Sequence, residues 1–168
     1  MKREIDPKDS PRAEAFSLWI SSPMPMVTLT KTLDIRKLLR RCRRNNLSFN
    51  MLMCWCIGKA ANSMKEFFLL PEDGRLFEFD RLAVNVIVQN NKGNINSCDI
   101  PFCDELLVFN EEYQRLTHQA AIKCESSFLE DYMVVGTSAM IQTELDCIIN
   151  QYTDAFCNPM VMWGKFRK

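Results

Sequence analysis

The segment that most constrains the fold is 49–64, which is apolar on nearly every side of a helix. Ser48 directly precedes it and begins the helix. Its apolar residues include Met51, Leu52, Met53, Cys54, Trp55 and Ile57. A helix without a polar face is stable only when it is buried on all sides. The sequence therefore predicts a central, buried helix in this region.

Several runs rich in β-branched residues predict strands. Residues 83–88 form the strongest of them, and a tight turn at 90–93 leads back into 95–98 as a hairpin. A turn at 72–74 likewise precedes a strand at 75–79. Further strands are expected at Met26–Leu33, Tyr132–Val135, Asp146–Ile149 and Pro159–Trp163, with Gly164–Lys165 as a hairpin tip.

Amphipathic helices are expected at 13–19, from the capping residue Asp34 through Cys42, and at 104–125, after an irregular lead-in at 7–11. The residues that should share one face of the long helix are Leu106, Leu107, Phe109, Tyr113, Leu116 and Ala120. Helices and strands are interspersed, and several strands connect by hairpins. This order predicts an α+β fold with a mixed β-sheet.

Composition narrows the class of protein. Hydrophobic residues make up 47% of the 168 residues and charged residues 25%, which fits one globular domain over residues 1–168. Basic and acidic residues both total 21, so the zero net charge gives no electrostatic case for nucleic acid or an anionic membrane. No GxGxxG or GxxxxGK[ST] motif is present. The charged start and the lack of a long apolar stretch predict a cytoplasmic protein.

The residues that could carry chemistry form no catalytic or metal-binding constellation. The eight cysteines lie at 42, 54, 56, 98, 103, 124, 147 and 157 without the paired spacing of a zinc site, so we expect buried thiols, no disulfides and no metal. His118 is the only histidine and is interpreted as a solvated or capping helix residue. The Arg/Lys run at 36–44 is interpreted as a solvated helix face.

Four blocks of sequence nevertheless occur in a familiar order. They are Leu33-Asp34-Ile35 after a strand, Ser48-Phe49-Asn50 at a helix start, 66–70 with 73–76 as a hairpin, and 155–166 near the end. The chloramphenicol acetyltransferase family shows a DIT entry, an F-x-P helix opening, an EFRMA-x-x-DGEL hairpin and an FFAPVFTMGKY block. The chain resembles this family from about Arg12 to Lys168.

The resemblance implies a CoA-dependent acyltransferase fold, a two-layer sandwich with the helices on one side of the mixed sheet. It further implies a homotrimer that transfers an acetyl group from acetyl-CoA, as co-substrate, to the hydroxyl of a chloramphenicol-like acceptor. By position, Trp19, Pro23, Pro25, Ile95 and Met162 fall where the family lines its acceptor pocket, and Arg12 where an arginine pairs with an aspartate.

The catalytic positions of the family match less well. Its histidine, in an HHAxxDG motif, lies about twenty residues beyond the block matched here at 155–166, so we expect the C-terminal strand and helix to be missing and this chain to be inactive alone. His118 cannot be that base, because it precedes the relevant strands. An ungapped overlay places Val135 at the oxyanion-stabilising serine, with Thr137 the next hydroxyl on that strand face and Ser138 after it.

Two alternatives stay open at this point. The chain could be a non-catalytic truncated relative that acts only in binding or assembly. It could also be an acyltransferase for another acceptor, such as a dithiol. A downstream HHxxxDG motif would distinguish a fragment of an enzyme from a non-catalytic relative.

Overall fold

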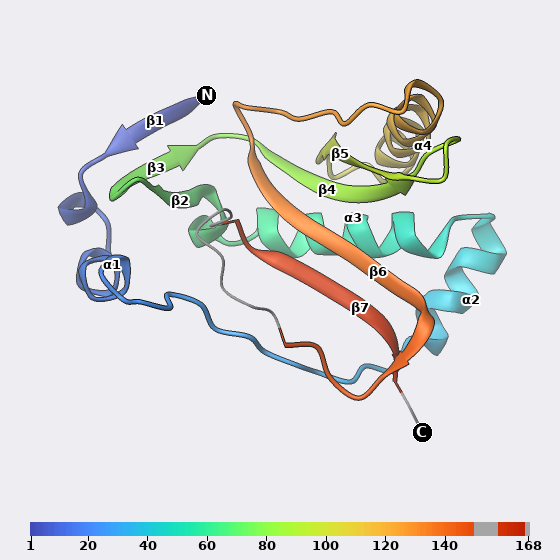
Figure 1. The fold of residues 1–168 in the computed structure, drawn as a ribbon, viewed down its shortest axis with the longest axis horizontal. Coiled ribbons are helices and arrows are strands. Elements are labelled where there is room, and N and C mark those ends of the chain that lie inside the picture. The colour runs from blue at the N-terminus through green and yellow to red at the C-terminus, as the bar shows by residue number, and fades with distance from the viewer. Residues whose placement is uncertain (150–157, 167–168) are drawn as a thin grey trace.

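A four-stranded mixed sheet forms the centre of the computed structural model, which describes residues 1–149 and 158–166 (Figure 1). Its strands are β4 (Leu82–Gln89), β5 (Ile95–Pro101), β6 (Met133–Leu145) and β7 (Met160–Phe166), in the order β5-β4-β6-β7. The β4–β5 hairpin is antiparallel, whereas β4, β6 and β7 run parallel. The predicted α+β fold with a mixed sheet is thereby confirmed.

Two helices, α3 (Phe49–Asn62) and α4 (Leu106–Lys123), pack on the same face of this sheet. Met51, Leu52 and Cys54 of α3 are at most 1% exposed, which confirms the predicted central helix. They join Val84, Val86, Cys98, Ile100 and Phe109 in one core cluster. On α4, Phe109 and Ala120 are buried as predicted, but Leu107 is 68% exposed, because it lies one residue off the inward-facing stripe.

A second, antiparallel sheet consists of β1 (Lys2–Ile5), β3 (Arg75–Phe79) and β2 (Leu69–Glu72), in that order. The predicted turn is present, since Asp73 and Gly74 both have positive φ, as a type I′ hairpin turn requires. β1 was not predicted, because its residues are mostly charged. It pairs with β3, and its charges are matched across strands: Lys2 with Glu72, Arg3 with Glu78, and Glu4 with Arg75.

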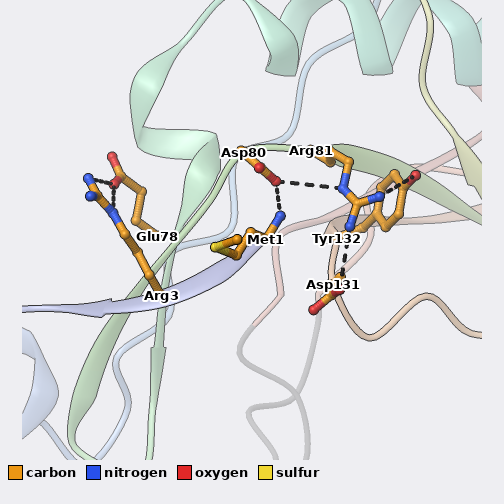
Figure 2. Close-up of polar contacts among 7 residues, drawn as sticks. All are labelled: Met1, Arg3, Glu78, Asp80, Arg81, Asp131 and Tyr132. Atoms are coloured by element: carbon orange, nitrogen blue, oxygen red, sulfur yellow. Dashed lines mark hydrogen bonds and ion pairs between the residues drawn. The ribbon is translucent and has the colours of Figure 1, made fainter.

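A chain of charged side chains joins this sheet to the start of β6 (Figure 2). The amino group of Met1 contacts the Asp80 carboxylate, and Asp80 lies 3.6 Å from Arg81 Nε. Arg81 reaches Asp131 at 3.4 Å and stacks over the ring of Tyr132, with Cζ 4.4 Å from the ring centroid. Because all these groups are substantially exposed, water screens each ion pair and its contribution to stability is small.

The first part of the chain holds η1 (Pro7–Asp9), α1 (Ala13–Ile20) and α2 (Arg36–Asn45), and η2 (Lys65–Phe68) follows α3. The strand predicted at Met26–Leu33 is wrong: residues 23–35 have no regular structure. Its apolar residues alternate as in a strand, yet Val27 is 68% and Leu29 91% exposed, and the segment pairs with no described strand. Among the described helices, none is long and apolar enough to cross a bilayer.

The last strands also differ from the prediction. The strand expected at Tyr132–Val135 extends to Leu145, and Asp146–Ile149 has no regular structure. Gly164–Lys165 is not a hairpin tip but lies inside β7. A Cβ at Gly164 would lie 3.0 Å from the carbonyl oxygen of Met140 and against Leu145, so the glycine allows close approach at the bulge between Met140 and Glu144.

Candidate functional site

Helices α3 and α4 cover one face of the four-stranded sheet, and none of the described helices covers the other face. Along β6, Met133, Val135 and Thr137 are buried against α3, and the alternation of a strand turns Val134, Gly136 and Ser138 to the other face. We call this the outer face. Ile87 and Met160 project from it and are 44% and 49% exposed, so the outer face offers apolar surface to another molecule.

On the outer face, a polar network crosses from β5 to β4. Asn85 Nδ2 donates to Asp99 Oδ1 at 2.6 Å and to Ser97 Oγ at 2.7 Å. The second carboxylate oxygen of Asp99 accepts from the backbone N–H of Leu129 at 2.9 Å. Asp99 is only 3% exposed, so its carboxylate has lost most of its hydrogen bonds to water. The two groups that donate to this carboxylate, Asn85 Nδ2 and the Leu129 N–H, compensate for that loss. Asn85 is thereby held in one orientation.

The register of the strands places this network beside β6 and β7. Asp99 pairs with Asn85, Asn85 with Gly136, and Gly136 with Met160, which makes one row across all four strands. Ser138 lies two residues further along β6 and pairs with Met162. The outer face therefore presents a hydroxyl beside an apolar side chain, next to the polar network.

Thr137, the sequence-based candidate for an oxyanion donor, faces α3 instead. Thr137 is 2% exposed, and its hydroxyl donates to the Asn85 backbone oxygen at 2.7 Å, with Cys54 Sγ 3.7 Å away. A hydroxyl has one proton to donate, so in this arrangement none is left for a substrate oxygen. The geometry of Thr137 is that of a structural bond between β6 and β4.

The five residues expected at the acceptor pocket are not gathered within one chain. Trp19 lies on α1 and is 48% exposed, and Pro23 and Pro25 are exposed in the irregular segment that follows. Ile95, the first residue of β5, is 70% exposed, and Met162 lies on β7. α1 and the β4–β5 hairpin lie on opposite sides of the molecule (Figure 1). Their role in acceptor binding stays a prediction.

Two open pockets are found elsewhere on the described surface, and none of these five residues lines either one. The first, of about 230 Å³, lies between α1 and the β2–β3 hairpin and is lined by Arg12, Phe16, Glu66, Leu69, Pro71 and Leu76. The second, of about 490 Å³, is lined by residues of α2 alone. Arg12 thus borders a small, mainly apolar hollow.

His118 lies on the covered side of the sheet, and the thiols of Cys54 and Cys98 are inert. His118 is exposed on α4, which confirms its predicted position on the long helix, on the covered side of the sheet. Burial raises the pKa of the Cys54 and Cys98 thiols to about 11, so both are protonated at neutral pH and are poor nucleophiles. Among residues 1–149 and 158–166, no three His, Cys, Asp or Glu side chains come together as metal ligands. The seven cysteines in these ranges are unpaired, and Cys157 lies outside the described residues. The expectation of buried thiols is wrong for Cys147, which is exposed.

Comparison with known proteins decides the family. A model of the family described as chloramphenicol acetyltransferase matches residues 3–168. The chain belongs to this family. Among solved structures, one described as a chloramphenicol acetyltransferase superposes with a TM-score of 0.83 at 20% identity, over 98% of this chain and 82% of that chain. At this identity the superposition supports the fold of the chloramphenicol acetyltransferase family. The comparison with curated proteins gives no match.

Sequence reasoning missed the network of Asn85, Ser97 and Asp99. A signal for it was present, because Asn85 interrupts an apolar run in β4 and Asp99 stands between Cys98 and Ile100 in β5. Polar residues inside otherwise apolar strands are buried only when they find partners. Two of them on strands joined by a hairpin could therefore have been paired with each other.

Proposed function

We propose that the protein is a subunit of an acetyl-CoA-dependent O-acetyltransferase that modifies a chloramphenicol-like acceptor alcohol. The observation that carries the proposal is the family match over residues 3–168. The outer face supports it, because Ser138 places a hydroxyl beside the apolar Met162 on partly exposed surface. Small ligands with apolar bodies and one reacting hydroxyl suit a site that is mainly apolar with few placed polar groups.

In the proposed reaction, the acceptor oxygen attacks the thioester carbonyl carbon while a base takes the hydroxyl proton. The tetrahedral intermediate carries an oxyanion. Its collapse breaks the C–S bond, and the protonated base returns the proton to the departing thiolate, which gives the free thiol of CoA. We assign the oxyanion donor to Ser138 rather than Thr137, because the Thr137 proton is donated to Asn85. A donor aimed at this oxygen typically contributes about 10²–10³ in rate.

The general base is proposed to come from the family's histidine motif, in a segment that would follow Lys168. His118 does not fit the role, since α4 lies on the opposite side of the sheet from Ser138. A base must approach the acceptor oxygen to about 2.6–3.2 Å and titrate near the working pH. Without that segment, the 168-residue chain should transfer acetyl groups at a small fraction of the rate of a chain that includes it.

The acceptor pocket is proposed to form between copies of the chain in a homotrimer, with Trp19, Pro23, Pro25, Ile95 and Met162 contributed by neighbouring subunits. The exposed apolar side chains of the segment 23–35 support this, because Val27, Leu29 and Leu33 are each more than 60% exposed. A partner that buries them would remove this apolar surface from water. Light scattering on a sizing column should give the mass of a trimer.

We also propose that the protein is located in the cytoplasm.

The experiment that tests the function follows release of the CoA thiol from acetyl-CoA in the presence and absence of chloramphenicol. Two chains are compared: the 168-residue chain, and one extended through the codons that follow Lys168. Acceptor-dependent thiol release by the extended chain, much faster than by the shorter one, supports the proposal. No acceptor-dependent release by either chain, with both folded, contradicts it and favours a role in binding or assembly.

A further inference from the structure

The outward face of α2 carries a dense group of cations that the proposed function does not use. Lys37, Arg40, Arg41 and Arg44 are all exposed and recur at the i, i+3, i+4, i+7 spacing of one helix face. With Asn45 they line the open pocket of about 490 Å³. We call these five residues the basic face. The helix stands at one end of the molecule, next to the start of α3 (Figure 1).

Counter-charges do not account for the basic face. Asp34 is paired with Arg36, whose hydrogen bonds lower the pKa of the Asp34 carboxyl to about 2. Within the described part of the chain, Lys37, Arg40, Arg41 and Arg44 take part in no ion pair. Like charges three or four residues apart on a helix repel and destabilise it.

The helix dipole does not account for it either. Cations are favoured in the last turn of a helix, which explains Arg43 and Arg44. Lys37 lies in the first turn, where the same dipole disfavours a positive charge, and Arg40 lies mid-helix. The basic face thus carries an electrostatic cost that an anionic ligand would relieve.

The packing of α2 restricts the kind of ligand. Leu38 and Cys42 are directed into the core cluster with α3, so α2 has no free apolar side with which to enter a membrane. The lining of the pocket contains only the four cations and the amide of Asn45. Without aromatic or aliphatic side chains, the lining offers no apolar surface for an acyl chain, so its charges favour an anionic ligand.

We propose that the basic face binds a small ligand that carries two or more closely spaced phosphate groups. The first and last of the four cations, Lys37 and Arg44, are seven residue steps apart, or about 10 Å along the helix, which suits adjacent phosphates. Guanidinium groups bind phosphate with two parallel N–H···O bonds, so three arginines and a lysine can engage several oxygens at once.

The test is calorimetric titration of the folded protein with tripolyphosphate at low ionic strength. The wild type should bind one equivalent, with affinity that falls as salt is added, because the contacts are exposed charges. Arg40→Gln with Arg44→Gln should weaken binding by about tenfold or more. Lys92→Gln with Lys123→Gln is the matched control, since both lysines are exposed and the change in net charge is the same.

Loss of affinity in the α2 variant but not in the control supports the proposal. Absence of binding by the wild type, or an equal loss in both variants, overturns it, because the attraction would then be absent or would belong to the whole protein. Neither result depends on acetyl transfer, so this proposal can fail while the proposed function stands.

Competition with coenzyme A identifies the source of the phosphates, and this arm rests on the proposed function. Displacement of tripolyphosphate by coenzyme A assigns the basic face to the phosphates of the donor. Binding of both at once assigns it to a separate phosphate ligand. Either outcome requires a phosphate site on α2 and therefore agrees with the proposal.

Discussion

The Asn85–Asp99 hydrogen bond should couple the two residues by about 1.5–3 kcal/mol in a double-mutant cycle, the usual worth of a hydrogen bond to a charged group. The perturbation consists of Asn85→Ala, Asp99→Ala and the double variant. The bond is short, 2.6 Å, and Asp99 is only 3% exposed, so water screens the interaction little.

Each single variant also has a cost beyond the shared bond. Asp99→Ala removes the acceptor of the Leu129 N–H, a bond worth about 1.5–3 kcal/mol. Asn85→Ala removes the bond to Ser97, worth about 1 kcal/mol, and leaves the buried Asp99 Oδ1 without its donor. The double variant should therefore be destabilised by less than the sum of the two single variants.

The assay is urea unfolding of all four proteins, with the free energy of unfolding taken from each midpoint and slope. The control cycle uses Arg3 and Glu78, an exposed pair whose coupling should stay below about 1 kcal/mol. A coupling for Asn85 and Asp99 no larger than that of the control would refute the argument that burial strengthens this bond.

Four further outcomes are expected. Phe109→Ala removes a fully buried ring and should lower the free energy of unfolding, measured by urea denaturation, by about 3–5 kcal/mol. A change below about 1 kcal/mol would be inconsistent with the burial of Phe109. Gly164→Ala should lower the melting temperature, because its Cβ would press on Met140 O and Leu145; an unchanged melt would argue against the register of β6 with β7. The raised pKa of Cys54 and Cys98 means that the unfolded chain ionises first, so stability should fall as pH rises from about 9 to about 11, and less steeply in Cys54→Ala. His118→Ala should leave acetyl transfer and stability unchanged, and a loss of activity would refute our placement of the base.

The sequence predicted those elements whose apolar pattern matches their burial. The central helix was predictable because Met51, Leu52 and Cys54 lie on an all-round apolar stretch, and the β4–β5 hairpin because β-branched residues flank a turn. β1 could not be found this way, because cross-strand ion pairs such as Arg3 with Glu78, rather than apolar burial, accompany its pairing.

The segment 26–33 shows the opposite failure. Its alternation of apolar and polar residues is that of a strand, but a strand forms only where a neighbour takes its backbone hydrogen bonds, and no described strand lies beside it. The prediction of a hairpin tip at Gly164 was wrong for a related reason. A glycine can mark a turn or a close approach of two backbone segments, and the local sequence does not distinguish the two.

The candidate site was only partly predictable. Alternation along β6 assigns Thr137 and Ser138 to opposite faces, but which face the helices cover is decided by tertiary packing. The bond from Thr137 to the Asn85 carbonyl joins residues 52 positions apart, which no local pattern reports.

The most direct test of the central claim, that the outer face of the sheet carries the acetyl-transfer site, is the rate of chloramphenicol acetylation by the extended chain and two variants. Ser138→Ala should lower the rate by about 10²–10³, the worth of one oxyanion donor. Thr137→Ser keeps a hydroxyl for Asn85 and should leave the rate within about threefold of wild type. Equal rates for Ser138→Ala and wild type, or a larger loss in Thr137→Ser, would contradict the assignment of the site to the outer face.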